Sequence, residues 1–471
     1  MQRTKPETTP NLDQGNDSPS ITIGDAIERA DWSGLATDMM AMMSQLFPVC
    51  RSITGDGNRK TLEALQARIP LQVHEVPTGY QAFDWTVPQE WNIRDAYIKD
   101  SQGKKIVDFQ KSNLHVLNYS TPVSATMTLE ELKPHLYANP AHPDAVPYVT
   151  SYYEQRWGFC LSQDQLDQLT AGNYEVYIDS SIEDGSLTFA DAVLPGESER
   201  EILLSTYFCH PSMANDNLSG PVLLAFLHQF LAQCRLNYTY RFVYVPETLG
   251  ALVYLSQHGD HLTKNLHAGY VASCVGDPGP YTYKRSRQGG TLADKVAEHC
   301  LSYLENDGED DGKAEIVDFF PMGSDERQYC SPGFNLPVGS LMRSMYGTYP
   351  EYHTSLDNLD YVSGDAIAST LRAYLRLVQV HEVNHRYINL SPYGEPQLSK
   401  RDLFPTIGAT IGGVTNDALT AGRTSRIMYL LSYSDGNNDL VDIAEKAGVP
   451  AWQFIPEINA LTEAGLLGKS T

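Results

Sequence analysis

Imidazole and carboxylate side chains follow strand-like apolar runs of this 471-residue chain, at positions that could assemble a metal site. These residues are His210, Asp216, Glu247, Asp277 and His353. Zinc accepts neutral imidazoles and carboxylates as ligands. A lone residue of any of these types more often caps a helix or bonds backbone. Five of them in comparable contexts instead predict a shared metal site.

The elements around the first two residues predict a turn where ligands bind. Residues 201–209 form a run rich in β-branched, aromatic and aliphatic side chains, which predicts a buried strand. After the Ser-Gly-Pro segment, which suits a helix start, residues 222–230 predict an apolar helix. His210 and Asp216 therefore share one strand-to-helix turn. Such turns line the ligand crevice of open α/β sheets, because the carboxyl ends of the strands meet there.

Three further apolar runs, 240–245, 268–275 and 336–341, predict strands of the same sheet. Glu247 and Asp277 follow the first two directly, and His353 follows the third after a longer loop. We therefore expect acid and imidazole groups from four loops to converge at one edge of the sheet.

Four segments resemble the zinc aminopeptidases of the cocatalytic type, which include bacterial secreted aminopeptidases and the plasma glutamate carboxypeptidase. Residues 214–220 (Ala-Asn-Asp-Asn-Leu-Ser-Gly) are similar to the motif of the bridging aspartate, and 246–250 (Pro-Glu-Thr-Leu-Gly) to the glutamate motif. Residues 323–325 resemble the Ser-Asp segment, and 352–357 the segment of the last histidine. The order is that of the family over roughly 187–385, which makes the resemblance specific.

This resemblance implies an α/β fold with a mixed sheet and helices on both faces. It also implies a zinc-dependent hydrolase, a metallo-aminopeptidase acting on a peptide or amide bond of a small substrate. The bridging aspartate corresponds to Asp216, the ligand histidines to His210 and His353, and the remaining aspartate ligand to Asp277. Glu247 corresponds to the catalytic base, which would take a proton from water that zinc has acidified.

The chain departs from the family pattern in two places. The family has two adjacent glutamates, one the base and one a metal ligand, whereas here Glu247 is followed by Thr248. The sequence therefore leaves open whether one or two zinc ions bind, and whether Glu247 is base or ligand. The segment between His210 and Asp216 is also shorter than in the family and lacks its extra aspartate.

Other functions stay open at this point. A changed ligand can leave a metal-binding scaffold with weak catalysis on an enzyme fold, and its C-terminal domain would then bind a protein partner. Glutaminyl cyclase-like chemistry or N-acyl hydrolysis would suit the same fold. His381, Glu382 and His385 also match the His-Glu-x-x-His pattern of other zinc peptidases. Both histidines, however, continue the apolar stripe of a predicted helix and could simply complete its packed face.

We predict four regions along the chain. They are a disordered tail (1–30), an aminopeptidase-like domain (31–82 and 173–388), an inserted β-rich domain (83–172) and a winged-helix-like domain (389–471). Aromatic residues among prolines and strand-like runs indicate the insertion, where they could line a lid or fill a small core. Helical runs at 426–431, 439–448 and 452–464 indicate the winged helix. The arrangement resembles bacterial aminopeptidase-like proteins labelled as polysaccharide-biosynthesis associated.

Composition narrows the partners and the compartment. A net charge of −24 argues against nucleic acid and anionic membranes as partners. The expected recognition helix carries Glu457 and Glu463 without Lys or Arg, so we expect protein contact there or plain packing. No apolar run is long enough to cross a bilayer, and the polar N-terminus does not read as a secretory signal. Seven scattered cysteines suit the cytoplasm, and we interpret Cys209 and Cys274 as buried thiols.

Overall fold

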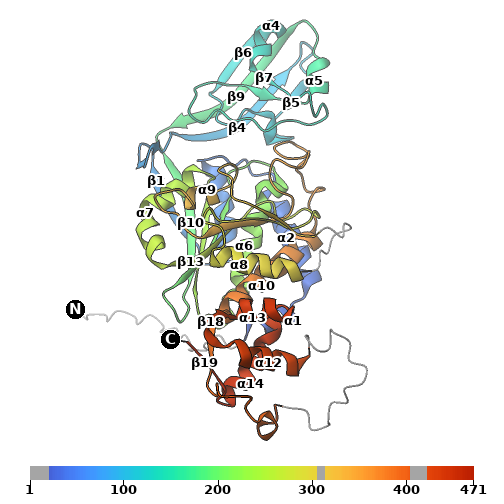
Figure 1. The fold of residues 1–471 in the computed structure, drawn as a ribbon. Helices are drawn as coiled ribbons and strands as arrows, with labels where there is room; N and C mark the ends of the chain where they lie inside the picture. Colours follow the sequence, from blue (N-terminus) through green and yellow to red (C-terminus); the bar gives the residue numbers. More distant parts are fainter. Residues whose placement is uncertain (1–20, 305–312, 404–421, 471) are drawn as a thin grey trace, which may run out of the picture.

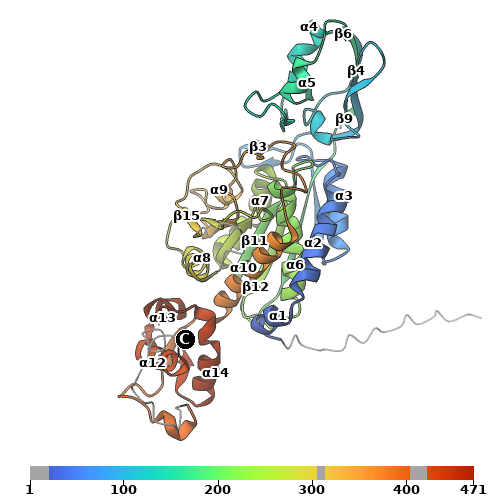
Figure 2. The same ribbon diagram turned by 90° about the vertical axis from the view of Figure 1, so that its right-hand side faces the viewer.

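The elements of the protein form three bodies in a row, as the computed structural model shows for residues 21–304, 313–403 and 422–470 (Figure 1). A large sheet with its helices lies in the middle. A smaller sheet lies beyond one end of it, and the C-terminal helices α12, α13 and α14 lie beyond the other, as the turned view also shows (Figure 2).

The central body contains an eight-stranded sheet in the order β1-β10-β12-β11-β13-β16-β14-β15. Its strands are β1 (Gln72–Pro77), β10 (Ser186–Leu194), β11 (Glu201–Tyr207), β12 (Thr239–Val245), β13 (Leu266–Ala272), β14 (Thr282–Lys284), β15 (Glu315–Val317) and β16 (Val338–Met342). The four strands β12, β11, β13 and β16 run parallel. Their carboxyl ends therefore share one edge, where ligands of α/β sheets bind.

Helices cover both faces of this sheet. They are α1 (Ile23–Arg29), α2 (Trp32–Leu46), α3 (Asp56–Gln66), α6 (Ser219–Leu231), α7 (Leu249–Asn265), α8 (Leu292–Tyr303), α9 (Glu326–Tyr329) and α10 (Gly364–Val383). Successive residues of β11 show the two layers. Ile202 and Leu204 pack in the cluster that contains α2, α6, α8 and α10, whereas Leu203 packs in the cluster that contains α7. The predicted α/β fold with helices on both faces is confirmed.

The first helix begins closer to the N-terminus than the sequence predicted. We expected a disordered tail over 1–30, but residues 23–29 form α1. Thr22 caps this helix, because its hydroxyl accepts the Asp25 N–H at 3.1 Å and its own N–H donates to the Asp25 carboxylate at 3.2 Å. Ile23 and Ile27 are buried against the central body. The rest of the predicted tail, residues 1–20, lies outside the described residues.

A second sheet interrupts the central one between β1 and β10. Its order is β5-β4-β9-β6, formed by β4 (Glu90–Lys99), β5 (Lys105–Asp108), β6 (Val123–Thr128) and β9 (Asn173–Glu183). The same region holds β2 (Gln81–Ala82), β3 (Trp85–Thr86), β7 (Leu136–Tyr137), β8 (Phe159–Cys160), α4 (Leu129–Leu132) and α5 (Gln163–Asp167). It has its own apolar cluster, to which Ala96, Ile98 and Val176 contribute.

Strand β9 lies in this second sheet, although we predicted that the central domain resumes at residue 173. β9 pairs with β4 and β6 along its length. Its residues alternate between exposed and buried, as in an antiparallel sheet that faces solvent on one side. The central sheet resumes with β10.

The C-terminal body combines helices with a small antiparallel sheet. Its elements are β17 (Arg386–Asn389), α12 (Arg423–Tyr433), β18 (Asp435–Asp439), α13 (Leu440–Ala447), α14 (Ile455–Glu463) and β19 (Leu467–Lys469). Lys295 of α8 joins it to the central body, because its ammonium lies 2.8 Å from Asp439 and 2.7 Å from Asp442. In α14, Glu457 is paired with Arg426 at 2.7 Å. That this body contacts protein rather than DNA stays a prediction.

Neither disulfide bonds nor membrane-spanning helices are found among the described residues. All seven cysteines are free thiols. Within the described ranges, no helix combines the length and the apolar composition that crossing a membrane requires.

Candidate metal centre

The turn after β11 holds two of the predicted ligands in fixed positions. His210 and Asp216 are buried there, and Tyr207 donates its hydroxyl hydrogen to Asp216 Oδ1 at 2.5 Å. The backbone N–H groups of Asn215 and Asp216 donate to the carboxylate of Asp357 at 2.6 and 2.8 Å. The Asp216–Asn217 peptide bond is cis. Asp357, from the loop that carries His353, thus fixes the backbone that presents Asp216.

His353 reaches the same point from the loop after β16. Its Nε2 lies 3.0 Å from Asp216 Oδ2, and its ring centroid lies 5.4 Å from that of His210. The backbone of His353 has φ +56, a left-handed conformation that is uncommon for residues other than glycine. Its carbonyl accepts the N–H of Tyr148 at 2.8 Å. Such strain is typical of functional sites, where the surrounding structure must hold it.

The three side chains fit a shared cation. One ligand atom from each of His210, Asp216 and His353 lies within 4.8 Å of the other two. Asp216 Oδ2 and His353 Nε2 are both buried, and apart from their mutual contact at 3.0 Å neither atom has a hydrogen-bond partner. A cation bound here would give both atoms a partner. The donor set of two imidazoles and one carboxylate suits zinc.

The ionisation states also suit a metal. Burial lowers the pKa of His210 to about 4, so its imidazole is neutral at neutral pH. Burial works against ionisation of Asp216, but the neighbouring His210 and His353 lower its pKa to about 2. Neutral imidazole and ionised carboxylate are the forms that bind metal.

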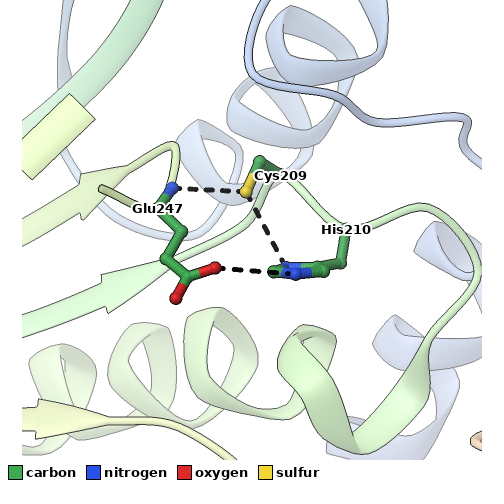
Figure 3. A group of neighbouring side chains, drawn as sticks. All are labelled: Cys209, His210 and Glu247. Carbon is green, nitrogen blue, oxygen red and sulfur yellow. Dashed lines mark hydrogen bonds and ion pairs between the residues drawn. The ribbon is translucent and has the colours of Figure 1, made fainter. Parts of the chain in front are cut away.

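Glu247 lies at the same edge, in the loop after β12. Its Oε2 is 3.6 Å from His210 Nε2 (Figure 3). Burial raises the pKa of Glu247 well above its ordinary value, and the negative charges of Asp325 and Asp216 add to this effect. A nearby dication would act in the opposite direction, because it favours the carboxylate.

Cys209 contacts both of these residues. Its Sγ accepts the N–H of Glu247 at 3.2 Å and lies 3.7 Å from His210 Nδ1 (Figure 3). Cys209, His210 and Glu247 therefore form a second group of close ligand atoms that shares His210 with the first. We interpreted Cys209 as a buried thiol, and it is buried. Its position next to His210 in the chain was the available signal for its place at the site.

The structure does not bring Asp277 together with the other predicted ligands. Within the described residues, neither group of close ligand atoms contains it. Its Oδ1 accepts the Ser344 hydroxyl at 2.6 Å and the Gly279 N–H at 2.8 Å, and its Oδ2 accepts the Asn215 side-chain amide at 2.9 Å. Both oxygens are thus engaged. Asp277 supports the Asp216 turn through Asn215.

Thr248 and Asp325 lie next to the site, and both belong to motifs of the family resemblance in which the sequence gave them no role. The N–H of Thr248 donates to Asp325 Oδ1 at 2.7 Å, and Thr248 has φ +64. Burial raises the pKa of Asp325 to about 7. The Ser-Asp segment of the family resemblance was the signal for Asp325. The segment gave no sign, however, that Asp325 contacts Thr248, the residue after Glu247.

The insertion contributes Tyr148, one of the aromatic residues that are frequent in this region of the sequence. Its ring centroid lies 5.3 Å from that of His210 and 5.4 Å from that of His353. Pro147 forms a β-bridge with Thr354, so the backbone of this loop is attached to the loop of His353. The insertion therefore provides a wall of the candidate site.

The His-Glu-x-x-His pattern does not form a site. His381 Nε2 lies 2.7 Å from the hydroxyl of Tyr270, and Glu382 accepts the Tyr240 hydroxyl at 2.8 Å. Helix α10 ends at Val383, so His385 lies outside the helix that the pattern requires. No group of close ligand atoms among the described residues includes them.

We expect His381→Leu to retain zinc and any hydrolytic activity, and to make folding less sensitive to acid. Burial lowers the pKa of His381 to about 3, whereas an unfolded histidine has about 6.5. The unfolded chain therefore takes up this proton first, and stability falls as the pH drops from 6.5 towards 3, by about 1.4 kcal/mol per unit. In unfolding measurements at several pH values, the free energy of unfolding of the variant should therefore depend less on pH between 6.5 and 3 than that of the wild type. Loss of zinc from the variant would contradict this interpretation.

Comparisons with known families identify two parts of the chain. A family model described as "Domain of unknown function (DUF4910)" matches residues 40–384. A winged helix-turn-helix model matches residues 385–469. The predicted C-terminal winged helix is therefore confirmed.

Similar proteins cover nearly the whole chain. A Clostridium acetobutylicum protein named "Putative polysaccharide biosynthesis protein with aminopeptidase-like domain" is 48% identical over 426 residues, 90% of this chain and 95% of that protein. A crystal structure of a "putative peptidase" from the same organism is 45% identical, covers 95% of this chain and 99% of its own, and has a TM-score of 0.87.

More distant structures share the fold alone. The zinc aminopeptidase BSAP from Bacillus subtilis is 13% identical, with a TM-score of 0.51 over 74% of this chain and 94% of its own. This agrees with the aminopeptidase-like fold that the sequence motifs implied. The chain belongs to the family described as domain of unknown function (DUF4910), on an aminopeptidase-like fold followed by a winged helix-turn-helix.

Proposed function

We propose that this protein is a zinc-dependent hydrolase of peptide or amide bonds, with His210, Asp216 and His353 as the zinc ligands and Glu247 as the general base. The observation that carries the proposal is the approach of the three ligand atoms to within 4.8 Å of one another, with the Glu247 carboxylate 3.6 Å from His210. The aminopeptidase-like fold and the names of the Clostridium relatives support the same class of reaction.

The side chains divide the chemistry between them. Zinc, when bound in such a site, lowers the pKa of a water molecule to about 7 and polarises a carbonyl oxygen. Glu247 is placed to take the proton of that water and to pass it to the leaving amine. Its side chain is 24% exposed, whereas Asp216 is fully buried. Glu247 therefore lies on the side of the cluster from which a substrate can approach.

One zinc ion suits these residues better than two. The residue after Glu247 is Thr248, whose hydroxyl accepts a hydrogen bond from Arg327 at 2.7 Å. The second group of close ligand atoms depends on His210, which the first group already uses. We therefore propose a single zinc ion per chain.

The direct test is metal content together with hydrolysis. Elemental analysis of the purified chain should find about one zinc ion per chain, and a panel of aminoacyl amides and short peptides should contain a substrate. Removal of the metal with a chelator should abolish turnover, and zinc should restore it. Protein that holds zinc but cleaves none of a broad panel would instead be a metal-binding scaffold, and product masses would reveal cyclisation or deacylation.

The insertion should matter for turnover because Tyr148 contacts both histidine ligands. We expect Tyr148→Ala to lower kcat/KM about tenfold, because loss of the ring leaves a gap beside His210 and His353. Tyr148→Phe keeps the ring and loses only the 2.7 Å hydrogen bond to the Tyr152 hydroxyl. It should stay within about threefold of the wild type. Steady-state kinetics on one substrate checks both, and equal losses would contradict a role for the ring.

A further inference from the structure

We infer that Arg327 binds a carboxylate beside the candidate metal centre, so that the amide cleaved there carries an anionic group. This inference rests on the proposed function, because it assigns a substrate class to that site.

Arg327 reaches the site from α9, which begins directly after Asp325. Its Nη2 donates to the hydroxyl of Thr248 at 2.7 Å, and Thr248 follows the proposed base Glu247 in the chain. The guanidinium therefore lies next to the segment that carries the carboxyl group that would act on the substrate.

The hydrogen-bonding capacity of Arg327 is largely unused. A guanidinium has five N–H donors, and the bond to Thr248 uses one of them. Its Nε is buried and has no hydrogen-bond partner among the described residues. A buried donor without a partner is energetically unfavourable. A ligand that accepts from this edge of the guanidinium would offset that cost.

The neighbouring carboxylates of Asp325 and Glu326 do not accept hydrogen bonds from Arg327. Asp325 Oδ1 accepts the N–H of Thr248, and Glu326 Oε1 accepts from the ammonium of Lys284 at 2.7 Å. Within the part of the chain that the structure describes, no carboxylate oxygen lies within 4.0 Å of a guanidinium nitrogen of Arg327.

A simpler role would be to neutralise the acids of the site. For that role alone, a direct ion pair with Glu247 or Asp325 would be the favourable geometry, yet the guanidinium bonds a neutral hydroxyl. Arg327 is only half-buried, and the side chain of Glu247, the residue before Thr248, is 24% exposed, so this part of the site is open to a ligand. A planar guanidinium matches a carboxylate through two parallel hydrogen bonds. The geometry therefore favours a carboxylate of the substrate as the partner.

The test uses matched substrates on the zinc-loaded full chain. Glutamyl and glutaminyl 4-nitroanilides differ by one charge before the cleaved bond, and a dipeptide and its C-terminal amide differ by one charge after it. We expect the wild type to prefer the charged member of at least one pair about tenfold in kcat/KM. Arg327→Gln should remove this preference, mainly through KM, because it lowers kcat/KM for the charged member far more than for the neutral member. A tenfold change corresponds to about 1.4 kcal/mol, as expected for one charge-assisted hydrogen bond.

Two further variants separate charge, geometry and folding. Arg327→Lys keeps the charge but loses the paired donors, and should retain part of the preference. Arg235→Gln is the control for charge. Arg235 is exposed, pairs with Glu197 and precedes β12 in the chain, so its loss should not change the preference between the paired substrates. Equal losses on both members of a pair in Arg327→Gln would overturn the inference, as would a wild type without preference for the charged members.

Failure of the proposed function can be told apart from failure of this inference. If no amide is cleaved, calorimetry with N-acetylglutamate and N-acetylglutamine on the zinc-loaded protein decides the question. Tighter binding of the acid that disappears in Arg327→Gln would support a carboxylate site without hydrolysis. Equal or absent binding of the two would overturn the inference.

Discussion

Replacement of His353 by alanine should remove most of the bound zinc and reduce hydrolysis about a thousandfold or more. His353 supplies one of three proposed ligands, and its Nε2 lies 3.0 Å from Asp216 Oδ2. Without it, His210 and Asp216 alone would have to hold the ion. Loss of an outer partner of a ligand already weakens metal binding by about 10–100-fold, so loss of a ligand itself should exceed that. Metal catalysis contributes several kcal/mol, which corresponds to the expected loss of rate.

Elemental analysis after dialysis, together with kcat/KM at saturating zinc, measures this effect. His228→Leu is the matched control. His228 is another buried histidine, and its Nε2 also lacks a hydrogen-bond partner, but it packs against Phe242 away from the cluster. The control should keep its zinc. If His353→Ala retains a full equivalent of zinc with unchanged affinity, the ligand assignment is wrong.

Glu247→Gln should keep the zinc and lose about 10²–10⁴-fold in kcat. Glutamine has nearly the shape of glutamate but cannot accept a proton at neutral pH, so the variant removes the base and little else. Because the carboxylate lies 3.6 Å from His210 Nε2, it could also serve as a ligand. The zinc content of this variant distinguishes the two roles that the sequence left open.

Three outcomes of this experiment are informative. Full zinc with a large loss of kcat supports the base. Loss of zinc comparable to that in His353→Ala would make Glu247 a ligand. Unchanged kcat would remove Glu247 from the mechanism. Thermal unfolding of the zinc-loaded variant is the control for folding, because a carboxamide at this partly exposed position changes the local charge.

Much of the central body could be predicted because local sequence and burial agree there. The run 201–209 is mostly apolar, as expected for a strand covered on both faces, and residues 201–207 of it form β11 in the centre of the sheet. The Ser-Gly-Pro segment begins α6 as predicted. Since the parallel strands end at one edge, the residues after them had to lie near one another. His210, Asp216, Glu247 and His353 follow this rule.

Two predictions, the extent of the N-terminal tail and the domain boundary at residue 173, were wrong. Residues 23–29 looked like part of a polar tail, yet a Thr22–Asp25 capping box and two buried isoleucines make them a helix. We assigned the residues after 172 to the central domain, yet β9 (Asn173–Glu183) belongs to the second sheet. The partner of a strand depends on which strand offers matching neighbours, and β4, which supplies them, lies far away in the chain.

The sequence by itself determined the order of the strands along the chain, the residues that follow them and the chemistry those residues could perform. Only the tertiary structure decided which side chains meet. The family resemblance assigned Asp277 as a ligand, but Asn215, Ser344 and Gly279 occupy its oxygens. Tyr148 and Arg327 reach the site from an insertion and a short helix. Side-chain contacts between segments so distant in the chain depend on packing, which no local pattern of residues encodes.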